Sequence, residues 1–187
     1  MIRSFLAIHP SSETLALLGG FQSEIGETGA DVRWVEPSSI HLTIQFLGDV
    51  RDSELSGIER SLEQSFRQQP PLEIDCRGMG VFPNLKKPRV VWVGIRSEGL
   101  SALADRTEIA LAPLGFPPEE RAFNPHLTVG RVRSPRGLEP LIALLRESGD
   151  RPFGKSRIDR AVLYKSDLRP TGSVYTPIAE IRFLGTE

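Results

Sequence analysis

The sequence predicts an α+β fold with antiparallel sheets, in a single domain that spans residues 1–187. Strand-like and helix-like segments are mixed without strict alternation, and several strand-like segments follow one another, which favours antiparallel sheets over a doubly wound parallel sheet. The Pro- and Gly-rich stretches are too short to be domain linkers. The composition, 39% hydrophobic and 25% charged, is that of an ordinary globular domain.

The expected strands are runs of β-branched, aromatic and other apolar residues. The first covers residues 2–8 and is ended by Pro10. The others cover residues 32–35, 40–47, 72–81, 89–95, 125–132, 158–164 and 174–183.

The expected helices carry apolar residues at helical spacing. The first begins at residues 11–13 and runs to residue 25, and the others cover residues 51–67, 100–114 and 138–146. Asp52 and Glu54 suit the positive N-terminal end of the second helix better than a metal site.

The charge balance excludes one class of function. The chain has 23 Lys and Arg against 24 Asp and Glu, a net charge of −1, whereas polybasic nucleic-acid binders depend on a large positive field. Cys76 is the only cysteine, which excludes an intrachain disulfide and a Cys-based metal cluster. No run reaches the roughly 18 apolar residues of a membrane span, and the N-terminal run is too short for a signal peptide. We therefore expect a cytoplasmic, monomeric enzyme or binding protein without a membrane segment.

Two of the three histidines open the same tetrapeptide. His41 begins His-Leu-Thr-Ile and His126 begins His-Leu-Thr-Val, 85 positions later. Each copy lies in an expected strand and is followed by an expected helix, which indicates two related halves rather than a short-period solenoid. His9 has no such partner, and we interpret it as a surface or capping residue.

Strand geometry sorts the side chains of these motifs, because residues i and i+2 point to the same face. His41 and Thr43 are therefore expected on one face. The other face would carry the apolar Leu42, Ile44 and Phe46. The second motif repeats this arrangement with its own histidine and threonine.

Two imidazoles and two hydroxyls that face each other suit a displacement at phosphorus. One neutral imidazole can take a proton from the attacking water or hydroxyl, and one imidazolium can protonate the leaving oxygen. The hydroxyls of Thr43 and Thr128 can donate hydrogen bonds to the non-bridging phosphate oxygens. This chemistry needs neither a metal nor a cofactor.

Two His-x-Thr-hydrophobic motifs half a chain apart resemble the 2H phosphoesterase superfamily, and most closely its bacterial and archaeal RNA 2′,3′-cyclic phosphodiesterases, also called 2′-5′ RNA ligases. The resemblance extends over nearly the whole chain. The segments that carry it are residues 3–8, 34–35, 40–43, 46–48, 80–83, 88–94, 123–131, 163–166 and 172–177.

The resemblance implies a bilobal fold of two antiparallel sheets related by a pseudo-twofold axis, with both motifs facing a central cleft. It implies hydrolysis of a terminal RNA 2′,3′-cyclic phosphate to a 2′-phosphomonoester, and a weak, reversible 2′-5′ joining of tRNA halves. His41 and His126 would be the acid/base pair, and Thr43 and Thr128 would hold the phosphate.

Two further site residues follow from the resemblance. Arg131 matches an arginine that would add positive charge near the phosphate, but strict alternation puts it on the face opposite His126, so a bend or bulge near Gly130 is required. Phe5 matches an aromatic position that could stack on a base, although a plain core phenylalanine fits equally well.

A basic loop, defined by Lys86, Lys87 and Arg89, could grip the RNA backbone or be a solvated turn. The sequence leaves the substrate open between an RNA end and a small cyclic nucleotide, and it does not tell which histidine is the base. The alternative function is an RNA-end or tRNA-binding module with weak or incidental catalysis. A metal-dependent hydrolase is disfavoured, because His-x-Thr offers no second ligand at a useful spacing.

Overall fold

The computed structural model describes residues 1–119, 121–169 and 172–185. Its helices are α1 (Ser12–Gly26), α2 (Asp52–Phe66), α3 (Leu100–Leu111) and α4 (Leu138–Glu147), with short 3-10 turns at Pro37–Ser39 and Ala112–Leu114. Its strands are β1 (Ile2–Ile8), β2 (Val32–Trp34), β3 (Leu42–Val50), β4 (Leu72–Phe82), β5 (Val90–Arg96), β6 (His126–Val132), β7 (Pro152–Ile158), β8 (Arg160–Arg169) and β9 (Gly172–Arg182).

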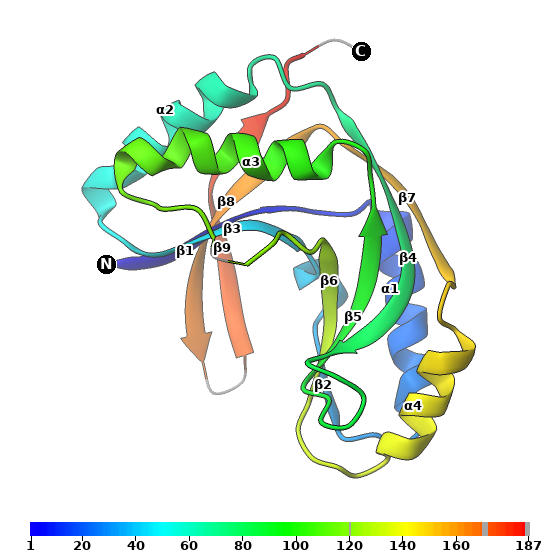
Figure 1. Ribbon diagram of the computed structural model, residues 1–187. Coiled ribbons are helices and arrows are strands. Elements are labelled where there is room, and N and C mark those ends of the chain that lie inside the picture. The colour runs from blue at the N-terminus through cyan, green and yellow to red at the C-terminus, as the bar shows by residue number, and fades with distance from the viewer. Residues whose placement is uncertain (120, 170–171, 186–187) are drawn as a thin grey trace.

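The strands form two sheets (Figure 1). The four-stranded sheet has the order β3-β1-β8-β9, and the five-stranded sheet has the order β2-β6-β5-β4-β7. Every neighbouring pair in both sheets is antiparallel. The predicted α+β fold with antiparallel sheets is confirmed.

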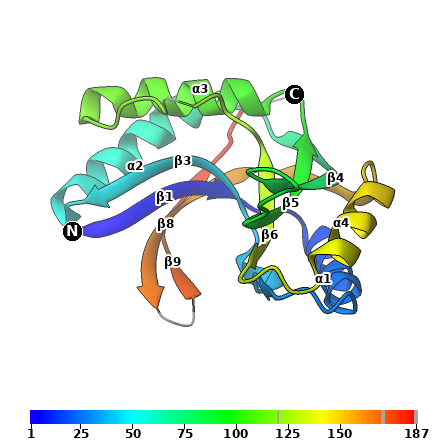
Figure 2. The ribbon, with the colours of Figure 1, turned by 60° about the horizontal axis from the view of Figure 1, so that its bottom comes forward.

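The helices show how the two halves of the chain are interleaved. After β1 of the four-stranded sheet, the chain continues into α1, which packs on β6 and β7 of the five-stranded sheet. After β5 of the five-stranded sheet, it continues into α3, which packs on β3 of the four-stranded sheet and on α2. Figures 1 and 2 show α2 and α3 over one sheet and α1 beside α4 at the other. Each motif strand, β3 and β6, follows one of these crossing helices.

The start of α1 is fixed by local polar contacts. Ser11 is the N-cap, and its hydroxyl oxygen accepts a hydrogen bond from the backbone N–H of Thr14 at 3.3 Å. The hydroxyls of Thr14 and Ser156 lie 3.0 Å apart, which ties α1 to β7. The predicted helix start is therefore confirmed.

The second helix begins as its charges predict. Asp52 and Glu54 lie in the first turn of α2, and the Glu54 carboxylate accepts a hydrogen bond from the backbone N–H of Arg51 at 2.8 Å. Cys76 is buried in β4, and burial raises the pKa of its thiol to about 12. No helix among the described residues is long and apolar enough to cross a membrane.

Strand β7 was not expected from the sequence. It begins at the exposed Pro152 and contains Gly154, and its other exposed positions are the charged Lys155 and Arg157. Its buried residues, Phe153, Ser156 and Ile158, pack at the edge of the five-stranded sheet beside β4. Pairing with β4 therefore outweighs a sequence of low strand propensity.

Candidate active site

The structure brings the two motifs together from different sheets. His41 directly precedes β3, and His126 is the first residue of β6. These two strands contact each other, and both views show them side by side near the centre of the molecule (Figures 1 and 2). The histidines are close enough that the charge of His126 disfavours protonation of His41.

Both catalytic candidates are anchored in the same way. Nδ1 of His41 lies 2.8 Å from the carbonyl oxygen of Ser39, and Nδ1 of His126 lies 2.7 Å from that of Asn124. Because a carbonyl oxygen only accepts, each Nδ1 carries the proton and donates. Nε2 of each ring is therefore the atom that can accept or release a proton.

Burial makes His41 a weak base. It lowers the pKa of His41 to about 4, and the positive charges of His9, Arg131 and His126 act in the same direction. The hydrogen bond to the carbonyl of Ser39 opposes this shift without cancelling it. At neutral pH, His41 is consequently a neutral imidazole that can accept a proton.

The first motif contains a β-bulge. Thr43 pairs with Ala7 of β1, but the next pair is Gln45 with Leu6, so Ile44 has no partner. A bulged residue shifts the alternation of the side chains that follow it. Residues 45–47 therefore lie on the opposite face from the one that simple alternation predicts, and a second register shift at Leu47 restores the alternation after them.

The second motif has its bulge at the same position. Thr128 pairs with Trp92 of β5, but the next pair is Gly130 with Val91, so Val129 has no partner. This is the bulge near Gly130 that the sequence required. We call the sheet faces that carry the motif threonines the motif face.

The bulges decide where two other side chains lie. Arg131 is on the motif face, where its charge disfavours protonation of His41. Phe46 is 59% exposed, and its ring centroid lies 6.1 Å from that of Phe5. The expectation that Phe46 shares the apolar face with Leu42 is wrong, because strict alternation ignores the bulge.

The buried ring of Phe5 packs against the ring of His41. The Phe5 ring is 3% exposed, and its centroid lies 4.9 Å from the His41 ring. Tyr164 and Tyr175 contact it at centroid distances of 5.4 and 5.0 Å. These neighbours surround Phe5, and its stacking on an RNA base stays a prediction. In the other half, the ring of Phe82 meets His126 edge-on at 5.0 Å.

The motif threonines are available to a ligand. Thr43 and Thr128 are both partly buried. No other group in residues 1–119, 121–169 and 172–185 forms a hydrogen bond with either hydroxyl. They can therefore donate to phosphate oxygens beside the two Nε2 atoms.

His9 is not the surface residue that the sequence indicated. It is partly buried, and its ring centroid lies 5.9 Å from that of His41. Its Nδ1 lies 3.1 Å from the carbonyl oxygen of Ile40, the residue before His41. Its Nε2 is buried and has no hydrogen-bond partner among the residues that the structure describes. A lone histidine before a proline gave no signal of this contact.

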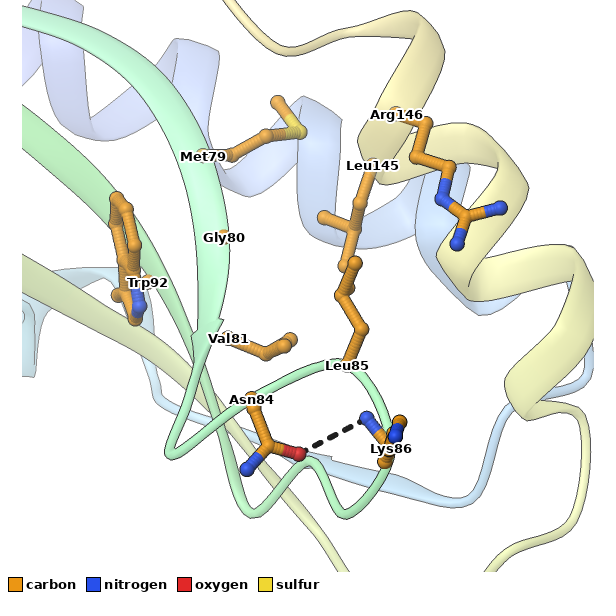
Figure 3. Close-up of a pocket in the computed structure, with 9 residues that line it drawn as sticks. All are labelled: Met79, Gly80, Val81, Asn84, Leu85, Lys86, Trp92, Leu145 and Arg146. Carbon is orange, nitrogen blue, oxygen red and sulfur yellow. Dashed lines mark hydrogen bonds between the residues drawn. The ribbon is translucent and has the colours of Figure 1, made fainter.

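A cavity of about 700 Å³ lies away from the motifs, between β4, the basic loop and α4 (Figure 3). Met79 and Val81 point from β4 towards α4, whereas Trp92 lies on the other side of the strand. Lys86 and Arg146 also line this cavity, and neither motif histidine does. The RNA-gripping role of the basic loop stays a prediction. Across the described residues, no group of three His, Cys, Asp or Glu side chains could hold a metal ion.

The model of the 2′-5′ RNA ligase superfamily matches residues 32–170. The chain belongs to this superfamily. Among superfamily relatives, a Methanothermobacter thermautotrophicus protein is 36% identical over 97% of this chain and 98% of its own length. An Aquifex aeolicus protein is 35% identical over 82% of each chain. Both are named RNA 2′,3′-cyclic phosphodiesterase.

Solved structures agree with this membership of the 2′-5′ RNA ligase superfamily. A Thermus thermophilus structure is 27% identical, with a TM-score of 0.85 and full coverage of both chains. Apo LigT of E. coli shares the fold, with a TM-score of 0.75 at 24% identity, and covers 96% of this chain. The resemblance that the twin motifs indicated is confirmed.

Proposed function

We propose that this chain hydrolyses the terminal 2′,3′-cyclic phosphate of RNA to a 2′-phosphomonoester. The observation that carries the proposal is the matched pair of histidines, each anchored through Nδ1 to a backbone carbonyl. Each is followed two residues later by a threonine whose hydroxyl forms no hydrogen bond within the described residues. The name that the relatives share, RNA 2′,3′-cyclic phosphodiesterase, supports the same reaction.

In the proposed reaction, His41 is the base and His126 is the acid. A water oxygen attacks phosphorus while Nε2 of His41 takes the water's proton. The bond from phosphorus to O3′ breaks, and Nε2 of protonated His126 gives its proton to O3′. The lowered pKa of His41 supports its role as the neutral partner.

The threonines and Arg131 would act on the phosphate itself. Thr43 and Thr128 donate hydrogen bonds to the non-bridging oxygens, whose negative charge grows in the transition state. Arg131, brought onto the motif face by the bulge at Val129, adds a positive charge beside them.

The same machinery can join RNA ends. If the 5′-hydroxyl of a second RNA takes the place of water, its oxygen attacks phosphorus, His41 takes its proton and O3′ leaves as before. The product is then a 2′-5′ phosphodiester, and the reverse step regenerates the cyclic phosphate.

The test is hydrolysis of a short RNA that ends in a 2′,3′-cyclic phosphate, in EDTA, with identification of the product. We expect a 2′-phosphate product from the native chain and turnover slower by about 100-fold or more from His126→Ala. A folded native chain that binds a 2′-phosphate end but does not turn over the cyclic phosphate would contradict the proposal and indicate an RNA-end-binding module.

A further inference from the structure

Arg33 is a basic residue outside both motifs. It is the middle residue of β2 and pairs directly with Arg131 of β6. Directly opposed residues of antiparallel strands extend to the same face, with Cβ atoms about 4.5–5.5 Å apart. Arg33 therefore lies on the motif face with Arg131.

The guanidinium of Arg33 lies close to the backbone of β9. A Cβ atom at Gly172, the first residue of β9, would overlap Nη2 of Arg33. Because β2 belongs to the five-stranded sheet and β9 to the four-stranded sheet, Arg33 reaches from one sheet to the other. The missing side chain at Gly172 provides the space that Arg33 occupies.

The charge of this arginine pair is not balanced within the described part of the chain. Like charges directly opposite each other in a sheet are destabilising. No carboxylate of residues 1–119, 121–169 or 172–185 forms an ion pair with Arg33 or Arg131, and both side chains are exposed. A bound anion would relieve the repulsion, and phosphate matches the fork of the guanidinium.

The position of β2 indicates which phosphate this is. β2 is the edge strand next to β6, so Arg33 lies one strand spacing, about 4.8 Å, beyond Arg131. Arg131 is the arginine whose charge acts on His41, where the reacting phosphate would lie. Arg33 therefore lies farther along the motif face than Arg131, at the edge of the sheet.

We propose that Arg33, together with Arg131, forms a subsite for a phosphodiester of the RNA chain that precedes the terminal cyclic phosphate. This inference rests on the proposed function. It makes an oligonucleotide end the preferred substrate, because a nucleoside 2′,3′-cyclic phosphate has no second phosphate for the subsite.

The test compares three substrates that share one reacting group. They are a nucleoside 2′,3′-cyclic phosphate, the same nucleotide with a 5′-phosphate, and a dinucleotide ending in that nucleotide. We expect Arg33→Gln to lower kcat/KM for the dinucleotide about tenfold and to leave the plain nucleoside within about twofold. The 5′-phosphorylated nucleotide shows whether a phosphate alone fills the subsite or the neighbouring nucleoside is also needed.

Arg67→Gln is the matched control, because Arg67 is an exposed arginine at the end of α2, away from the motif face, and its loss changes the net charge equally. We expect it to leave all three substrates unchanged. An Arg33→Gln variant that keeps the native preference for the dinucleotide, or that lowers kcat/KM for every substrate equally, overturns the subsite. Thermal unfolding of each variant excludes a folding defect as the cause.

A binding measurement separates this inference from the proposed function. Calorimetry would compare a nucleoside 2′-phosphate with a dinucleotide ending in a 2′-phosphate, neither of which reacts. We expect the native chain to bind the dinucleotide more tightly and Arg33→Gln to lose about tenfold of that affinity. If the native chain shows no turnover, the proposed function fails, and this comparison alone decides the subsite. Equal affinities for both ligands overturn it.

Discussion

Ile44 and Val129 are each the unpaired residue of a β-bulge, one position after the threonine of their motif. The bulges turn the third residue after each threonine onto the motif face. That residue is Phe46 in the first half and Arg131 in the second. Each half of the fold therefore places one extra side chain beside its His–Thr pair, aromatic in one case and cationic in the other.

Replacing two phenylalanines, Phe46 and Phe5, should lower the free energy of unfolding by very different amounts. Phe46→Ala should change the free energy of unfolding by no more than about 0.5 kcal/mol, because the side chain is 59% exposed. Phe5→Ala should cost about 3–5 kcal/mol, because a buried ring beneath His41 is lost. Denaturant unfolding of the two variants measures both values. Equal losses would contradict the exposure of Phe46.

The threonine hydroxyls should matter for the chemical step and not for folding. Thr43→Val and Thr128→Val keep the shape of the side chain but remove its donor, so each should lower kcat/KM by about 10- to 100-fold. Thr→Ser at the same positions is the control and should retain most of the activity. Steady-state kinetics on a cyclic phosphate checks this, and a full-activity Thr128→Val would exclude Thr128 from phosphate binding.

The lowered pKa of His41 predicts an acid-tolerant enzyme. A general base must be neutral, so kcat/KM falls as the pH drops through the pKa of His41 in the free protein. That pKa is about 4, below the ordinary histidine value of 6.5. The acid limb of the kcat/KM profile should therefore lie well below pH 6.5. An acid limb at or above pH 6.5 would indicate that His41 is not the base.

The same shift predicts a pH-dependent stability. Between about pH 4 and 6.5, the unfolded chain binds a proton at His41 that the folded chain excludes, so stability is present above this window and is lost as the pH falls through it. The slope is at most about 1.4 kcal/mol per pH unit. His41→Gln should flatten the dependence of the unfolding free energy on pH. Burial lowers the pKa of His9 too, so His9 keeps part of the slope in the variant. Identical slopes for the two proteins would contradict the shift.

The sequence could predict most strands, the helices and the two histidines, because those depend on local pattern and on one repeated tetrapeptide. Residues 2–8 and 126–132 form strands almost as expected. The pattern failed for Phe46, since a single bulged residue reverses the faces that follow it. It also failed for β7, because proline, glycine and charged residues have low strand propensity. The strand forms because it pairs with β4.

Arg33 and His9 could not be found from the sequence for a different reason. Each is brought to the site by a residue far along the chain, Arg33 by its pairing with Arg131 and His9 by the carbonyl of Ile40. No local spacing encodes such contacts. The one signal for Arg33 was its place between Val32 and Trp34, which puts it alone on the polar face of a short strand.

The central claim is that His41 and His126 act as one acid/base pair. The most direct measurement is kcat/KM on an RNA ending in a 2′,3′-cyclic phosphate for His41→Ala, His126→Ala and the double variant. We predict that each single change lowers the rate about 100-fold or more and that the double change lowers it little further, because loss of either partner disables the same step. Two modest losses that multiply in the double variant would contradict the claim, because each histidine would then act independently.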